Sequence, residues 1–92
     1  MTILTEEQLK NVRFLAIDLE TEFVNEYDPS LSKDKVNDIV ADFENRINEA
    51  GIPDDIRTNL LNRLFDENLF DVDALSSTYE YLYMVLDAHK FN

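Results

Sequence analysis

The chain has 92 residues, of which 20 are Asp or Glu and 8 are Lys or Arg, and its formal net charge is −12. Hydrophobic residues make up 45% of it, which excludes a disordered acidic tail because so much apolar surface drives burial in a core. The absence of cysteine excludes a disulfide framework, a thiol nucleophile and a thiolate metal site, and a single glycine excludes a phosphate-binding glycine loop.

The N-terminal segment predicts a helix over residues 5–27. Thr5 followed by Gln8 has the pattern of a capping box, in which each residue satisfies a backbone N–H of the other. Apolar residues recur at spacings of three and four, as on the buried face of a helix: Leu9, Val12, Ala16, Leu19, Phe23 and Tyr27. Pro29 follows this segment and cannot continue the helix.

A second helix is predicted over residues 32–50. Ser32 is its expected N-terminal cap, and Gly51 is expected to close it in a left-handed conformation. Its apolar positions form a narrow stripe: Val36, Ile39, Val40, Phe43, Ile47 and Ala50. This stripe predicts that one face of the helix is buried and that the opposite face meets water.

Two further helices are predicted in the rest of the chain. Pro53, in a first-turn position, opens one that runs to about residue 66, with these apolar positions: Ile56, Leu60, Leu61, Leu64 and Phe65. Asp71 is the expected cap of the other, over residues 72–90, with this core stripe: Val72, Leu75, Tyr79, Leu82, Tyr83 and Leu86. The pattern predicts an all-α fold, a compact four-helix bundle formed by one acidic helical domain over residues 1–92.

Apolar residues also lie outside the core stripes of the first and last predicted helices. They are Phe14, Ile17 and Val24 on the first, and Tyr81, Met84, Val85, Ala88 and Phe91 on the last. Either neighbouring helices enclose them or they form a surface for self-association, because monomers rarely expose contiguous apolar patches. We predict a homodimer whose interface includes the following residues: Phe14, Ile17, Tyr81, Met84, Val85 and Ala88.

Residues suited to catalysis or metal binding are few. His89 is the one histidine, and its place near the end of a helix favours a structural role because a cation there meets the negative end of the helix dipole. The acids that begin at Asp66 do not form an EF-hand, since the twelfth position is Ser77 rather than Glu and the sixth is not Gly. We predict a protein that is not an enzyme and that takes no cofactor or metal.

The sequence also bears on location and on nucleic acid. Its N-terminus lacks the basic and apolar regions of a signal peptide, and no apolar run reaches the roughly 18 residues of a membrane span, so we expect a cytoplasmic protein without a membrane partner. Nucleic acid is not an expected partner, because the bases are scattered and most have an acid three or four positions away. The bases are Lys10, Arg13, Lys33, Lys35, Arg46, Arg57, Arg63 and Lys90.

Acidic residues recur every four positions on the first two predicted helices. Such like-charge pairs destabilise a helix by about 0.2–0.5 kcal/mol each, whereas selection for solubility alone would mix both signs. On the second helix Asp34, Asp38 and Asp42 are four apart, and Asn45 and Glu49 continue the row. The row on the first helix is Asp18, Glu22 and Glu26, and Asp54 and Asp55 open the third helix. We expect both rows to face water and the field that they produce to have a use.

Duplex DNA carries comparable rows, with one negative charge per about 3.4 Å on each strand. Carboxylate rows on rigid helices therefore predict a DNA mimic that occupies the DNA-binding site of another protein and uses the steering evolved for phosphate. The nine acids of the two rows and of the third helix are the candidate phosphate surrogates. A charged face that is merely solvated is the alternative interpretation of the same pattern.

The whole chain resembles the small DNA-mimic anti-restriction proteins of T-even bacteriophages. The resemblance lies in its length, its acidic and helical character, its lack of cysteine and its apolar surface residues. The resemblance implies a dimer that blocks a host DNA-binding protein, either a restriction endonuclease of the McrBC kind or a nucleoid protein such as H-NS. It assigns no residues. Two other functions remain open, namely an acidic immunity protein or antitoxin that caps a basic nuclease toxin, and a structural component of a larger complex.

Overall fold

Four α-helices make up the structure, a computed structural model that describes residues 3–69 and 71–90. They are α1 (Glu6–Glu26), α2 (Lys33–Glu49), α3 (Asp54–Leu64) and α4 (Asp71–Lys90). No strand occurs in these two ranges, and none of their helices combines the length and the apolar character that crossing a membrane requires. The predicted all-α, four-helix fold is confirmed.

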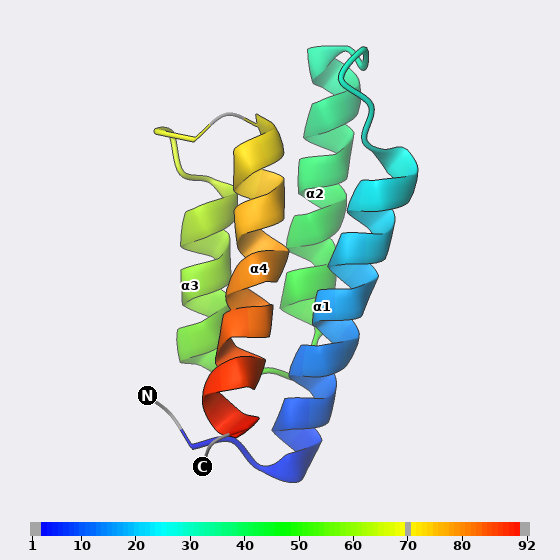
Figure 1. The fold of residues 1–92 in the computed structure, drawn as a ribbon. Helices are drawn as coiled ribbons and strands as arrows, with labels where there is room; N and C mark the ends of the chain where they lie inside the picture. The colour runs from blue at the N-terminus through cyan, green and yellow to red at the C-terminus, as the bar shows by residue number, and fades with distance from the viewer. Residues whose placement is uncertain (1–2, 70, 91–92) are drawn as a thin grey trace.

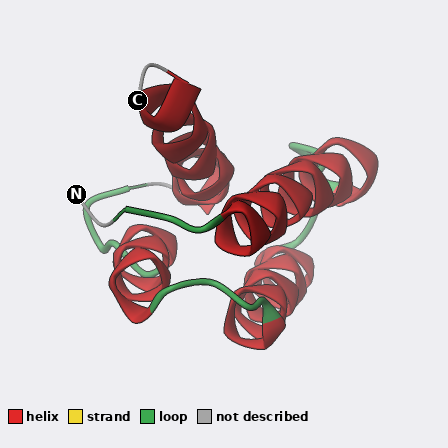
Figure 2. Ribbon diagram, turned by 90° about the horizontal axis from the view of Figure 1, so that it is seen from below, coloured by secondary structure: helices red, strands yellow, loops and turns green. Residues whose placement is uncertain are grey.

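The helices form a bundle in which each runs antiparallel to the one before it (Figure 1). Seen along the bundle, they stand roughly at the corners of a square, with α1 diagonally opposite α3 (Figure 2). α1 packs more extensively on α4 than on α2. The seam between α1 and α2 is therefore the more open side of α1.

The predicted N-terminal caps of the first two helices are confirmed. The Thr5 hydroxyl accepts a hydrogen bond from the backbone N–H of Gln8 (3.1 Å), and the Gln8 side chain accepts one from the N–H of Thr5 (3.0 Å). The Ser32 hydroxyl accepts from the N–H of Lys35 at 3.4 Å. These bonds satisfy N–H groups that lack a partner in the first turn of a helix.

Gly51 follows α2 for a reason that differs from the predicted one. No residue of the described ranges has a positive φ, so the expected left-handed cap is wrong, and Ala50 ends the helix with extended backbone instead. The Asn11 side chain of α1 donates a hydrogen bond to the Gly51 carbonyl at 2.8 Å, and a β-carbon at position 51 would lie 2.8 Å from the same nitrogen. The site favours glycine because a side chain of another helix approaches it closely.

Three predicted helix ends are shifted. Pro53 is the N-cap of α3 rather than a first-turn residue, and its carbonyl accepts from the N–H of Arg57 at 3.0 Å. α3 ends at Leu64 instead of residue 66, because the chain tightens into a bond from the Asp66 N–H to the carbonyl three residues back. α4 begins at Asp71, one residue before the predicted start, and the capping role of the Asp71 side chain stays a prediction.

The core lies between the four helices and follows the predicted stripes. Its largest fully buried apolar side chains are Val12, Leu19, Phe43, Ile47, Leu60, Leu75 and Leu82. Aromatic rings join α1 to α4, with the centroids of Phe23 and Tyr79 5.7 Å apart. Phe65, which was predicted as a core residue, is 52% exposed because the chain leaves α3 just before it.

Candidate functional site

The acidic row on α2 lies on the surface, as predicted. Asp34, Asp38, Asp42 and Glu49 are exposed, and the apolar stripe of the same helix is buried. A step of four residues advances about 6 Å along a helix axis, so the row spans most of α2. Within the part of the chain that the structure describes, Asp34, Asp38 and Glu49 make no ion pair.

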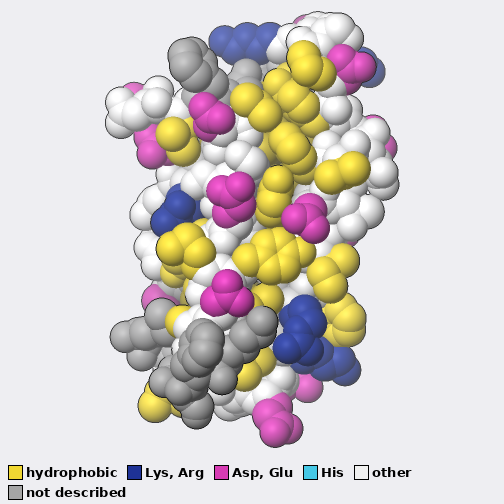
Figure 3. Space-filling view, in the orientation of Figure 1, with side chains coloured by type: hydrophobic (Ala, Val, Ile, Leu, Met, Phe, Trp, Pro, Cys, Tyr) yellow, Lys and Arg dark blue, Asp and Glu magenta, His cyan; other side chains and the backbone are white. Residues whose placement is uncertain are grey.

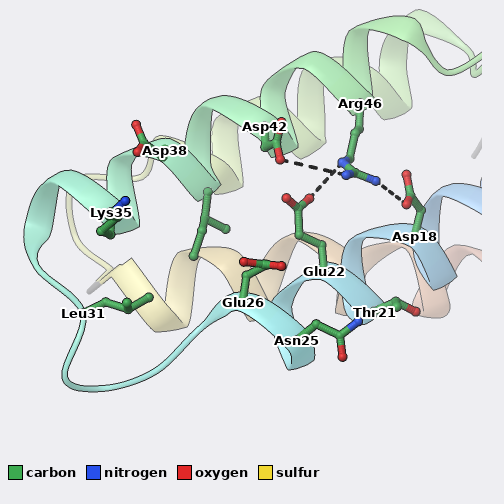
Figure 4. A pocket seen from close by; sticks show the side chains of 11 residues that line it. Asp18, Thr21, Glu22, Asn25, Glu26, Leu31, Lys35, Asp38, Asp42 and Arg46 are labelled. Atoms are coloured by element: carbon green, nitrogen blue, oxygen red, sulfur yellow. Dashed lines mark hydrogen bonds and ion pairs between the residues drawn. The ribbon is translucent and has the colours of Figure 1, made fainter.

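The acidic row on α1 reaches the surface only in part. Glu26 is exposed and the Asp18 side chain is 45% exposed, but the Glu22 side chain between them is only 8% exposed. The prediction that all three face water is therefore wrong at Glu22. The cause is that this position of α1 is turned toward α2, where Arg46 covers it (Figure 4).

Arg46 of α2 binds carboxylates of both rows (Figure 4). Its Nη1 donates a hydrogen bond to Asp18, its Nε lies 2.8 Å from Oε2 of Glu22, and its Nη2 lies 3.9 Å from Oδ2 of Asp42. One guanidinium thus joins α1 to α2 across their seam. The pair with Asp42 lies within α2, as the spacing of four residues favours, whereas the other two acids belong to α1 and were not predicted as partners.

Sequence reasoning does not single out Arg46. The available signal is its position on α2, between the buried stripe that contains Phe43 and Ile47 and the exposed row that contains Asp42. A base at the edge of a buried face is placed to reach a neighbouring helix, yet which helix lies beside that edge depends on the packing of the bundle.

The Glu22 carboxyl group is electrostatically unusual. Burial raises the pKa of Glu22 from 4.5 to about 7, and a hydrogen bond with Asp42 and the negative charges nearby add to this rise, which Arg46 opposes. Oε2 of Glu22 accepts no hydrogen bond even though Nε of Arg46 is 2.8 Å away, because the N–H is not aligned with it. This group changes its charge near neutral pH, in contrast to an ordinary surface carboxylate.

A groove of about 620 Å³ runs along the α1–α2 seam (Figure 4). Its lining includes five carboxyl groups and two bases, namely Asp18, Glu22, Glu26, Asp38, Asp42, Lys35 and Arg46. Leu31 and Ile39 are its apolar lining residues. On the other side of Arg46 a second hollow of about 430 Å³ continues along the seam toward Phe14 and Glu49.

Asp54 and Asp55 do not line this groove. They lie in the first turn of α3, where Asp54 pairs with Arg57 one turn further along and keeps its side chain 94% exposed. Asp55 is exposed and lines a separate, mainly apolar hollow between α3 and α4. The structure therefore brings together the predicted acids of α1 and α2 but not those of α3.

The predicted self-association residues divide into exposed and buried ones. Phe14, Ile17 and Val24 on α1 are 59%, 49% and 70% exposed, and Met84 on α4 is 61% exposed. Val85, in contrast, is 4% exposed and belongs to the core, so its assignment to a dimer interface is wrong. The physical reason is that α3 packs beside this edge of α4 and covers it.

Tyr81 and Ala88 share the covered edge of α4 and are half-buried. The Tyr81 hydroxyl accepts a hydrogen bond from the Asn59 side chain at 3.0 Å, and the Arg63 guanidinium lies 4.7 Å from the centre of its ring. Phe91 lies outside the described residues. Figure 3 shows hydrophobic side chains along the α1–α4 side of the molecule with single carboxylates among them, so the apolar surface there is interrupted.

His89 is engaged within its own helix. Its Nδ1 lies 2.8 Å from the carbonyl oxygen of Val85, one turn back, and the residue is half-buried. In residues 3–69 and 71–90, no three His, Cys, Asp or Glu side chains are arranged to hold a metal ion.

Comparison of the chain with protein-family models, with curated proteins and with solved structures finds no match. The features of the molecule that bear on function are therefore those of its surface, above all the α1–α2 seam and the acidic row beside it.

Proposed function

We propose that this protein inhibits a DNA-binding protein by presenting carboxylates in place of DNA phosphates. The target in this proposal is a host restriction endonuclease or nucleoid protein, and the inhibitor acts in the host cytoplasm. It binds no nucleic acid itself, catalyses no reaction and requires no cofactor.

The observation that carries the proposal is the exposed row on α2. Asp34, Asp38 and Glu49 lie on one rigid helix with no ion pair among the described residues, and Asp42 continues the row between them. The step of about 6 Å along the helix axis between members four residues apart is close to twice the roughly 3.4 Å of duplex axis per phosphate of one DNA strand. A cleft lined with Lys and Arg attracts such a row over a long range, before any contact is made.

The Arg46 contacts narrow the set of phosphate surrogates. Asp18, Glu22 and Asp42 already share one guanidinium, so part of their charge is used within the protein. The carboxylates that keep their full effect on a partner are then Asp34, Asp38, Glu49 and Glu26.

Neutralising the row on α2 tests the proposal. We expect the triple variant Asp34→Asn, Asp38→Asn and Glu49→Gln to weaken inhibition by about tenfold, since exposed charge pairs contribute roughly 0.2–1 kcal/mol each. The measurement is displacement of a labelled DNA duplex from the target protein over a series of salt concentrations. Wild-type inhibition should fall steeply as salt rises, and the fold should remain equally or slightly more stable because repulsion along the row is relieved.

A matched control changes the same net charge elsewhere. Glu67→Gln, Asp73→Asn and Glu80→Gln neutralise three exposed acids of the α3–α4 connection and α4, and should leave inhibition nearly unchanged. Equal loss in both triple variants, or a target that binds DNA and this protein at the same time, would contradict the proposal. A single nuclease toxin as the partner, without inhibition of other DNA-binding proteins, would favour an immunity protein or antitoxin.

We also propose that the protein forms a homodimer through the outer face of α1. Phe14, Ile17 and Val24 are exposed there, and two exposed bases, Lys10 and Arg13, lower the repulsion between acidic copies at this face. Because Val85 is buried and Tyr81 packs on α3, α4 is not part of this interface.

Sedimentation tests the dimer. The wild type should sediment as a dimer at micromolar concentration. The dimer should be more stable at higher salt, because salt screens the repulsion between the two copies. Ile17→Glu should give a monomer of unchanged helicity, whereas Met84→Glu, at an exposed apolar site on α4, should leave the dimer intact. A wild type that is monomeric throughout would exclude the dimer, and dissociation by Met84→Glu alone would move the interface to α4.

A further inference from the structure

The groove along the α1–α2 seam has carboxylates on both of its long sides. Glu22 and Glu26 belong to the α1 side, and Asp38 and Asp42 belong to the α2 side (Figure 4). The Arg46 guanidinium crosses the seam where it joins the two helices, and Leu31 lies toward the opposite end of the groove. The stretch between these ends has carboxyl groups on two sides, and Lys35 of α2 is a base in its lining.

The size and the lining of the groove indicate what fits in it. An α-helix with side chains is about 10–12 Å wide and rises 5.4 Å per turn, or roughly 500 Å³ per turn. A groove of about 620 Å³ therefore accepts the inward face of a helix of about two turns. Leu31 is half-buried and supplies most of the apolar surface for that face, because only 7% of Ile39 is exposed, and the groove is far larger than a single metal ion requires.

We propose that this groove binds a basic, amphipathic α-helix of the partner protein. The apolar face of that helix would rest on Leu31 and on the small exposed part of Ile39, and its Lys and Arg side chains would meet Glu26 on one wall and Asp38 on the other. DNA presents a comparable arrangement, because its major groove admits an α-helix between two phosphate backbones. The inference rests on the proposed function and identifies the part of the target that the mimic engages.

The probe for this site is a pair of synthetic peptides of about 15 residues, long enough to form a helix. One places leucines at helical spacings of three and four with lysines on the flanks, and the other has the same composition in scrambled order. We expect the amphipathic peptide to bind about tenfold more tightly than the scrambled one, as measured by fluorescence anisotropy at about 0.15 M salt. Equal affinity of the two peptides would overturn the proposal, because charge alone would then explain the binding.

Variants of the groove locate the binding. Glu26→Lys with Asp38→Lys should weaken binding of the amphipathic peptide by about tenfold, and the milder pair Glu26→Gln with Asp38→Asn should act in the same direction. Asp73→Lys with Glu80→Lys makes the same charge change on α4 and should alter the affinity by about twofold or less. Equal loss in the α4 control would overturn the proposal, and circular dichroism verifies that each variant is folded.

The peptide experiment requires no target protein, so its failure differs from failure of the proposed function. If a DNA-binding protein is inhibited but the two peptides bind equally, the helix-binding groove is rejected and mimicry through the outer row of α2 stands. If the groove selects the amphipathic peptide but no DNA-binding protein is inhibited, the groove stands as a helix-binding site and DNA mimicry is rejected.

Discussion

Replacing Phe43 with alanine is expected to lower the free energy of unfolding by roughly 3–5 kcal/mol. The Phe43 side chain is fully buried in the core between the helices, so the substitution removes apolar contacts and leaves a cavity. Urea unfolding followed by circular dichroism measures the change. A small domain has a total stability of about 5–15 kcal/mol, so this single change removes a large part of it.

Phe65 provides the matched control for Phe43. It is the same residue type, but it is 52% exposed just beyond the end of α3, so Phe65→Ala should cost about 1 kcal/mol or less. Similar losses in the two variants would show that the ring of Phe43 is not packed as the structure has it.

Replacing Glu22 with glutamine is expected to stabilise the protein above neutral pH. In the fold, burial raises the pKa of Glu22 from 4.5 to about 7. The stabilisation from the protonated, buried carboxyl is therefore fully present below pH 4.5 and is lost as the pH rises through 7. Glutamine keeps the neutral form at every pH, so the variant should exceed the wild type by up to about 3 kcal/mol at a pH above 7.

Urea unfolding of both proteins at several pH values between 4 and 9 measures this difference. Asp18, Asp42 and Arg46 surround Glu22 and are present in both proteins, so the difference between the two curves reports on Glu22. Glu26→Gln, one turn further along α1 at an exposed position, is the control and should retain the pH dependence of the wild type. Parallel curves for the wild type and Glu22→Gln would contradict the assignment.

The candidate site was predictable where a single helix determines it. The row on α2 lies opposite a narrow apolar stripe, so burial of Phe43 and Ile47 requires Asp34 and Asp38 to face water. The row on α1 was predicted correctly only at its ends. Glu22 is buried because α2 lies beside it, and helical periodicity carries no information about a neighbouring helix.

The exposure of the apolar residues also depends on neighbouring helices, which helical periodicity does not predict. Met84 and Val85 are adjacent in sequence and both were expected on an exposed patch, yet Met84 is 61% and Val85 is 4% exposed. The apolar residues on α1 that were expected on the surface, Phe14, Ile17 and Val24, are exposed. The difference arises because α3 covers one edge of α4, and the sequence pattern of α4 does not reveal which edge that is.

By itself the sequence determined the local features of this protein. The four helices, the caps at Thr5 and Ser32 and most of the core follow from turn residues, capping side chains and apolar spacing, which act over a few neighbouring residues. Only the tertiary structure decided the burial of Glu22, the role of Arg46 and the reason for Gly51. Each of these depends on a side chain of another helix that lies 24 to 40 positions away in the sequence. Whether the two residues come into contact is set by how the four helices pack.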